Sequence, residues 1–230
     1  MPDLCHNTIS LPEVENFKKT IQPYIHDRFE KVYKDTDDDG QYIYAILPTG
    51  IPMMQREIDL DFEKIVPMPE PIKRTRDDSF DEESDDGRKL LQANFLNYGQ
   101  AEWYAWVQEN WGAKWSYYGT FHSQDKSFFF CTPWRPPIAA IVKLATLLRT
   151  PVQLDYVDED DLGYLGRSLC RPDGNNIHIR YEQACKAPLA IQIGVMKALR
   201  GWRSDEYEEC KNALIRERKW WHSLQQKNNA

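Results

Sequence analysis

Residues 127–157 read SFFFCTPWRPPIAAIVKLATLLRTPVQLDYV and hold a strand, a helix and a second strand in one stretch. The unbroken apolar run Phe128 to Cys131 predicts a strand buried on both faces, in the centre of a sheet. Pro136-Pro137 opens a helix whose apolar residues recur every three or four positions, at Ile138, Ile141, Leu144, Ala145 and Leu148. A second strand, Val152 to Val157, follows Pro151. The stretch therefore predicts a sheet with a helix packed across it.

The strands predicted elsewhere extend this sheet. Thr120 to Thr132 is typical of a hairpin that turns at Gln124-Asp125-Lys126, and Leu4 to Leu11 alternates apolar and polar side chains as a half-buried strand does. Three more extended runs are predicted at Tyr42 to Leu47, Ile58 to Val66 and Asn176 to Tyr181, with a short strand or turn between Gly163 and Gly166.

Four further helices are predicted from apolar spacing. They cover Glu13 to Tyr33 with a kink at Pro23, Lys89 to Trp111 with an optional break at Tyr98-Gly99, Leu189 to Arg200, and Asp205 to Gln226. Helices that alternate with strands and hairpins, without a glycine-rich turn between strand and helix, favour an α+β fold. We expect a ferredoxin-like split βαβ sheet packed by helices in residues 1–182, and a C-terminal helical extension in residues 183–230.

Charge is concentrated in one short segment. The chain of 230 residues has a net charge of −7, and Asp77 to Asp86 alone carries seven acids and no base. The rest is balanced, with 29 bases against 29 acids, so direct nucleic-acid binding is the less favoured class. Residues 71–88 combine this acidity with low hydrophobicity, which predicts a mobile insertion. No apolar stretch or leader suggests a membrane, and we expect a cytoplasmic protein.

The residues that usually perform chemistry form no recognised motif. Five cysteines lie far apart without a CxxC pair, and five histidines show no metal-ligand spacing. Walker, Rossmann and Gly-x-Ser-x-Gly patterns are absent. We therefore assign no catalytic residue, no metal ligand and no cofactor from these patterns, and expect the cysteines to be reduced and mostly buried.

Two acidic clusters leave a metal-dependent alternative open. Asp35-x-Asp37-x-Asp39-Gly40 has the spacing of the first half of a calcium loop, but its twelfth position is Ile46 where a bidentate Glu is expected. The carboxylates from Asp155 to Asp161 gather where a strand ends, as in a two-metal phosphodiesterase. A metal-dependent nuclease that uses this second cluster is the alternative function.

Five of the eight tryptophans lie between Trp103 and Trp134. On a helix, Trp103, Trp106 and Trp111 fall near one face, which favours a tryptophan-rich core over an exposed stacking platform for bases or a sugar.

Five segments of the chain carry a resemblance to a known family: Met1 to Asn7, Phe62 to Glu70, Trp103 to Trp115, Thr132 to Pro137 and Gly163 to Gly166. In these segments the chain resembles the YubB-like family of plasmid and phage proteins. The resemblance implies a ferredoxin-like domain, a mobile-element origin and hence a bacterial host cell. It does not indicate any particular activity. The acidic insertion and the C-terminal extension depart from the family pattern.

These observations favour a non-catalytic binding protein of a phage or plasmid. Such a protein could inhibit a host defence complex of the CRISPR or restriction type, because an acidic segment can occupy a Lys/Arg groove meant for nucleic acid. The expected partner is thus a host protein or nucleoprotein complex. The last helix offers a second contact surface, or a homodimer interface. The residues expected to bind the partner are Asp81, Glu82, Glu83, Asp85, Asp86, Arg216 and Trp220.

Overall fold

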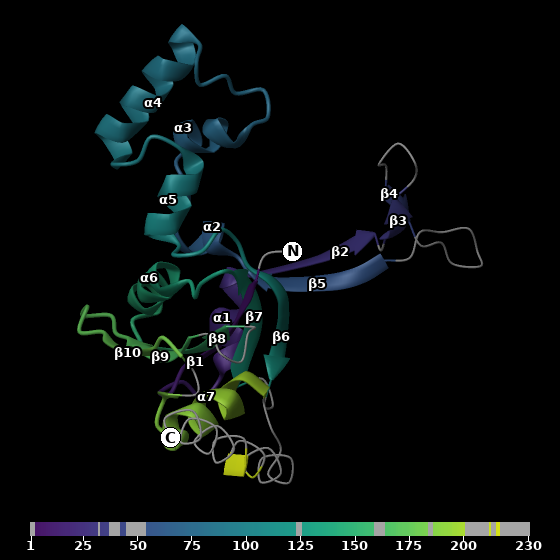
Figure 1. The fold of residues 1–230 in the computed structure, drawn as a ribbon, viewed down its shortest axis with the longest axis vertical. Coiled ribbons are helices and arrows are strands. Elements are labelled where there is room, and N and C mark those ends of the chain that lie inside the picture. The colour runs from purple at the N-terminus through teal and green to yellow at the C-terminus, as the bar shows by residue number, and fades with distance from the viewer. Residues whose placement is uncertain are drawn as a thin grey trace, which may run out of the picture.

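The computed structural model describes the backbone of most of the chain. The described residues are 3–31, 33–36, 42–44, 54–122, 126–158, 164–183, 186–200, 212 and 215–216. The fold is mixed α+β, as the sequence predicts, and a single antiparallel sheet is its centre (Figure 1). Among these residues, no helix is both long and apolar enough to span a bilayer.

The central sheet has six strands in the order β10-β9-β8-β1-β7-β6. Their bounds are Leu4–Ser10 for β1, Tyr117–His122 for β6, Ser127–Pro133 for β7, Val152–Asp158 for β8, Leu165–Cys170 for β9 and Ile177–Tyr181 for β10. The predicted hairpin is confirmed as β6 and β7, and the strand Phe128 to Cys131 lies inside the sheet, as expected. The observed six-strand order differs from the four-stranded sheet of a plain ferredoxin-like domain.

Helix α6 (Ile138–Leu148) connects β7 to β8, which lie on either side of β1. Its buried residues Ala140, Ile141, Leu144 and Ala145 repeat at helical spacing and contact the apolar face of the sheet, where the main core lies. On the opposite face, α7 (Leu189–Arg200) packs against β8, β1 and β9 and encloses a small second core of Leu165, Ala187, Val195 and Leu199. The first helix after residue 182 is therefore part of the sheet's packing.

A group of short helices stands above one end of the sheet (Figure 1). It comprises α2 (Phe62–Ile65), α3 (Glu70–Lys73), the 3-10 turn η2 (Arg74–Arg76), α4 (Asp85–Tyr98) and α5 (Trp103–Asn110). Residues 71–88, predicted as a mobile insertion, contain regular structure, since α3, η2 and the start of α4 lie within them. Ile72 and Thr75 are buried and anchor this segment to the helix group. Its structure therefore depends on these buried residues and not on its acidic composition. The optional helix break is confirmed, because Gly99 ends α4 at φ 78°.

The predicted helix from Glu13 to Tyr33 is correct only between Phe17 and Tyr24, since residues 13–16 are not helical and a strand begins at Ile25. Helix α1 (Phe17–Ile21) passes into the 3-10 turn η1 (Gln22–Tyr24), which contains Pro23, and the chain continues as β2 (Ile25–Lys31). Proline removes a helical hydrogen bond, and β2 instead pairs along its length with β5 (Met54–Leu60). The predicted run Ile58 to Val66 likewise ends at Leu60, where Asp61 caps α2.

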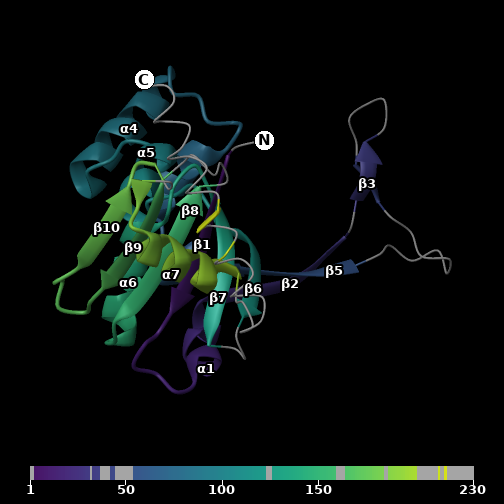
Figure 2. The same cartoon turned by 60° about the horizontal axis from the view of Figure 1, so that its bottom comes forward.

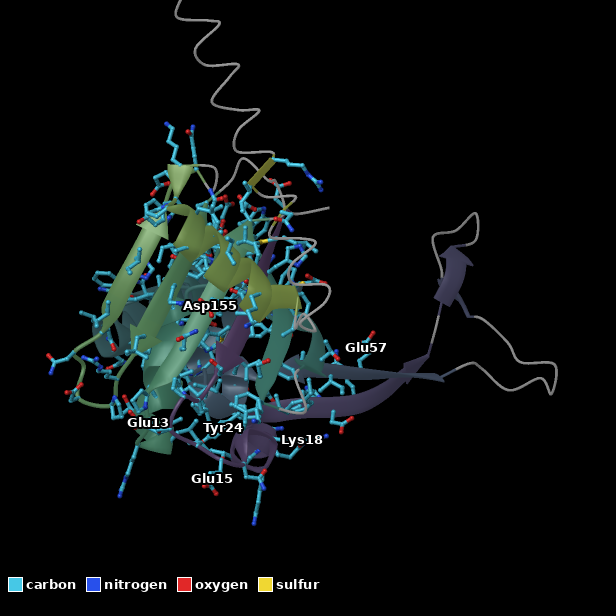
Figure 3. All side chains as sticks on the ribbon, turned by 90° about the horizontal axis from the view of Figure 1, so that it is seen from below. Glu13, Glu15, Lys18, Tyr24, Glu57 and Asp155 are labelled. Carbon is cyan, nitrogen blue, oxygen red and sulfur yellow. The ribbon has the colours of Figure 1, made fainter. Side chains whose placement is uncertain are left out.

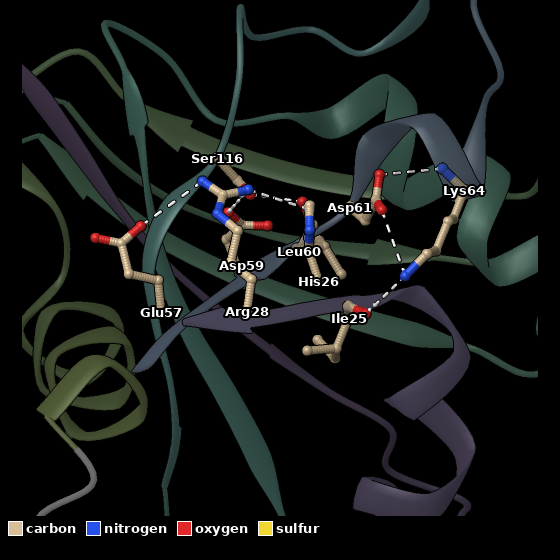
Figure 4. A network of polar contacts seen from close by, with 9 residues as sticks. All are labelled: Ile25, His26, Arg28, Glu57, Asp59, Leu60, Asp61, Lys64 and Ser116. Atoms are coloured by element: carbon tan, nitrogen blue, oxygen red, sulfur yellow. Dashed lines mark hydrogen bonds and ion pairs between the residues drawn. The ribbon is translucent and has the colours of Figure 1, made fainter. Parts of the chain in front are cut away.

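Strands β2 and β5 form a two-stranded arm that projects from the side of the sheet, and β3 (Tyr33–Thr36) and β4 (Tyr42–Tyr44) lie at its far end (Figures 1 and 2). Polar contacts fix the base of the arm (Figure 4). The Lys64 Nζ donates to the Ile25 carbonyl at 2.8 Å, and the Arg28 guanidinium lies 3.6 Å from Glu57 and 3.9 Å from Asp59. Two elements thus hold the arm to the body, α2 through Lys64 and β6 through its packing on β5.

Candidate partner-binding surface

The five acidic residues predicted to bind a partner lie together at the start of α4. Asp81, Glu82 and Glu83 form the turn before the helix, and all three are exposed. Asp85 and Asp86 occupy the first helical turn, with side chains 86% and 98% exposed. Acidic side chains at this end of a helix interact favourably with the helix dipole.

Hydrogen bonds hold the acidic turn in one conformation. The Ser84 hydroxyl donates to the Asp81 carbonyl at 2.8 Å and accepts from the Gly87 N–H at 2.9 Å, which caps α4. Glycine is required at 87 because a Cβ there would lie 2.0 Å from the Asp81 carbonyl oxygen. Upstream, two hydrogen bonds from Ser79 lower the pKa of the Asp77 carboxyl. The acids therefore form a surface of fixed shape.

An open hollow of about 680 Å³ lies between this turn and the helix group. Its lining includes Arg74 and Lys89 as well as Asp81 and Asp86, with Phe80 and Leu90 at its apolar part. The hollow can therefore receive a side chain of a partner, with the Asp81 carboxylate and the Asp86–Lys89 ion pair on its rim.

Helix α4 is buried along one narrow face only. Asn94 is 1% exposed and its side-chain amide donates to the carbonyls of Pro71 and Ala101, at 3.1 and 3.0 Å. In contrast, Phe95, Leu96 and Tyr98 are 61%, 74% and 39% exposed. Three large apolar side chains on one helix end are more than scattered exposure explains and indicate a contact surface. We call the acidic turn together with the exposed face of α4 the α4 surface.

The tryptophans divide into a core pair and an exposed group. Trp106 and Trp111 are buried with their rings 5.7 Å apart, and the Trp111 indole donates to the Val66 carbonyl at 2.9 Å. The core interpretation is confirmed for these two. Trp115 is 38% exposed, and the Lys114 ammonium lies 4.5 Å from its ring and 5.1 Å from that of Trp103. Pairing of this kind covers the ring faces that bases would need for stacking.

Of the carboxylates proposed for the nuclease alternative, the structure describes Asp155 and Asp158 and does not bring these two together, while Glu159 to Asp161 lie outside the described residues. Asp155 is 1% exposed on the face of β8 beside α7, where Arg167 Nε and Gln153 Nε2 donate to it at 2.6 and 2.7 Å (Figure 3). Burial raises the pKa of this carboxyl, and the bonds from Arg167 and Gln153 offset part of the rise. Asp158 is three positions along the strand, so it lies on the opposite face. The described residues contain no group of three metal-ligating side chains.

The structure places one polar row that the sequence patterns missed. Tyr156, Ser168 and His178 come from three adjacent strands, with the Ser168 Oγ 2.5 Å from Nδ1 of the imidazole and the Tyr156 oxygen 3.3 Å from its Nε2. Burial, and then the nearby Arg180 guanidinium, lower the pKa of His178. Ser168 is only 2% exposed, so this row ties the strands together and leaves the hydroxyl out of reach of a substrate.

Other predicted residues are settled only in part. Arg216 is helical and exposed, whereas Trp220 and the loop Asp37 to Gly40 lie outside the described residues. Cys5, Cys131 and Cys170 are buried free thiols, as expected, and burial raises the pKa of Cys170 to about 11. A thiol so protonated is a poor nucleophile.

Comparisons of the chain with family models, with curated proteins and with solved structures give no match.

Proposed function

We propose that the protein is a non-catalytic binding protein whose α4 surface contacts a basic protein groove. The observation that carries the proposal is the combination, on one exposed helix, of five carboxylates at its start and three bare apolar side chains at its end. Carboxylates steer the approach to Lys and Arg and select the partner, while the apolar side chains contribute affinity once water is displaced.

The resemblance to the YubB-like family supports a phage or plasmid origin. In this proposal the partner is a host defence complex of the CRISPR or restriction type, since those complexes bind nucleic acid in grooves lined by Lys and Arg. A rigid acidic helix of suitable shape competes for such a groove without any bond being made or broken.

The proposal extends to the fold. The four neighbouring strands β8-β1-β7-β6, with the α6 crossover between β7 and β8, follow a split βαβ order. We infer that these strands are the ferredoxin-like domain that the family resemblance implies, with β9 and β10 added at one edge and the arm inserted before β6.

The experiment is a phage plating assay. The protein is expressed in hosts that each carry one defined CRISPR or restriction system, and a targeted phage is plated on them. We expect plating to rise on at least one host. Asp85→Ser with Asp86→Ser should reduce the rise, whereas the matched pair Glu13→Ser with Glu15→Ser, which are exposed acids near α1, should leave it intact (Figure 3).

Two results would contradict the proposal. Unchanged plating on every host would remove the anti-defence role. Equal loss with both pairs of substitutions would show that total charge matters and that the α4 surface does not. Binding of the purified protein to the inhibited complex should also weaken as salt is raised, and less steeply for the Asp85/Asp86 variant.

A further inference from the structure

Strand β10 ends the central sheet on one side. Among the described residues, its inner edge pairs with β9 and no strand pairs with its outer edge. Figures 1 and 2 both place it at the margin of the sheet. The outer backbone N–H and C=O groups of such a strand are a template for another strand.

Proteins usually protect an edge of this kind, and β10 lacks several of the usual devices, although it is short and carries Arg180. Its pairing with β9 runs without a bulge from Ile177 to Tyr181, and the strand contains neither proline nor lysine. Ile177 and Ile179 lie on the same face of the strand and are 48% and 37% exposed. Exposed β-branched residues on a regular edge are the features that promote strand pairing.

We propose that β10 pairs antiparallel with β10 of a second copy of this chain, about a two-fold axis at His178. In this register Ile177 of one copy lies opposite Ile179 of the other, and the symmetry repeats that apolar pair. The two six-stranded sheets become one continuous sheet across the interface.

The side chains of the strand favour a second copy over an unrelated peptide. An isologous interface needs a self-complementary patch, and this strand supplies one because its two isoleucines lie symmetrically about His178. Arg180 adds no unpaired charge, since its guanidinium bonds to Glu182 at 3.2 Å and stacks over the Tyr164 ring. Burial, and then the nearby Arg180 guanidinium, lower the pKa of His178, which disfavours charge on the imidazoles that meet at the axis.

Analytical ultracentrifugation of the full chain over a range of concentrations tests the pairing. We expect a monomer–dimer equilibrium that Ile177→Lys or Ile179→Lys weakens by about tenfold or more, since each change removes two cross-strand apolar pairs. Leu147→Lys is the matched control, because Leu147 is 43% exposed and belongs to α6, which takes no part in the backbone pairing at β10. This variant should dimerise like the wild type.

Cysteine crosslinking tests the register. Residues directly opposite in an antiparallel pair have Cα atoms about 4.5 to 5.5 Å apart, which suits a disulfide. Of the single variants Ile177→Cys, His178→Cys and Ile179→Cys, only the second should give a dimer above the wild-type background on a non-reducing gel. Strongest crosslinking at 177 or 179 would overturn the pairing about His178. A wild-type chain that stays monomeric at its highest soluble concentration would overturn the dimer and leave the edge to a foreign extended peptide.

Discussion

Replacing Arg167 by Ala should leave the buried Asp155 carboxylate without its ion-pair partner. The Asp155 side chain is 1% exposed and the Arg167 side chain is 32% exposed, with 2.6 Å between Nε and Oδ1. Removing one partner of a fully buried ion pair costs about 3 to 5 kcal/mol. Because Arg167 retains contact with solvent, we expect a loss of about 2 to 3 kcal/mol in the free energy of unfolding.

The assay is urea unfolding followed by far-UV circular dichroism, with thermal unfolding as a second measure. At roughly 2 to 4 °C per kcal/mol for a chain of this size, the melting temperature should fall by about 4 to 12 °C. The double variant Asp155→Val with Arg167→Val is the control, since an apolar pair leaves no charge behind and should cost less than Arg167→Ala alone.

The pH dependence gives an independent signature. Burial raises the pKa of Asp155, so the folded chain holds this proton more tightly than the unfolded chain does. Such a group raises the free energy of unfolding as the pH falls from its raised pKa in the folded chain toward its ordinary pKa in the unfolded chain. The deficit of Arg167→Ala relative to the wild type should therefore shrink in acid. A loss below about 1 kcal/mol, or a double variant less stable than Arg167→Ala, would refute the reasoning.

Three further substitutions test other parts of the fold. Gly112→Ala should destabilise more than Gly174→Ala in urea unfolding: both sites have positive φ, at 83° and 81°, but only a Cβ at 112 meets backbone, 3.1 Å from the Ile138 nitrogen. Trp111→Phe leaves the Val66 carbonyl without its indole donor and should cost about 1 to 3 kcal/mol in the same assay, and no change would show that the bond is unimportant. The lowered pKa of His178 means that the unfolded chain binds its proton first, so stability should fall as the pH drops below about 6.5, and His178→Asn should flatten that slope.

Local sequence patterns predicted most strands of the central sheet. They gave the wrong element where pairing between distant residues determines whether a segment is helix or strand. The apolar run in β7 and the spacing of α6 each have one good interpretation, and both are confirmed. Ile25 fits a helical stripe as well as a strand. Only its pairing with Leu60, 35 positions away, selects the strand, and a local pattern contains no information about that partner.

The composition of the acidic segment did not predict its helices, for a different reason. Its composition is that of a disordered chain, yet Ile72, Thr75 and Asn94 supply a few buried anchors that fix it to α4 and α5. Composition averages over such anchors. The candidate acids are neighbours because they are close in sequence, and their role as a binding site stays a prediction. The row of Tyr156, Ser168 and His178 depends on strand register and has no local signal beyond the alternation in β10.

Where the fold places its polar groups bears directly on the kind of activity it can have. Two described groups suited to chemistry are closed off: Asp155 is bound by Arg167 beside α7, and Ser168 is buried against His178. A catalyst needs such groups to meet substrate, and opening either site would expose a core that α7 or β10 now covers. The carboxylates of α4 and the isoleucines of β10 are, by contrast, exposed on regular elements. Among the described residues, exposed charge and apolar area on regular helices and strands support the role in recognition that we propose. Asp155→Ala should accordingly lower the free energy of unfolding, and neither this variant nor the wild type should cleave a phosphodiester.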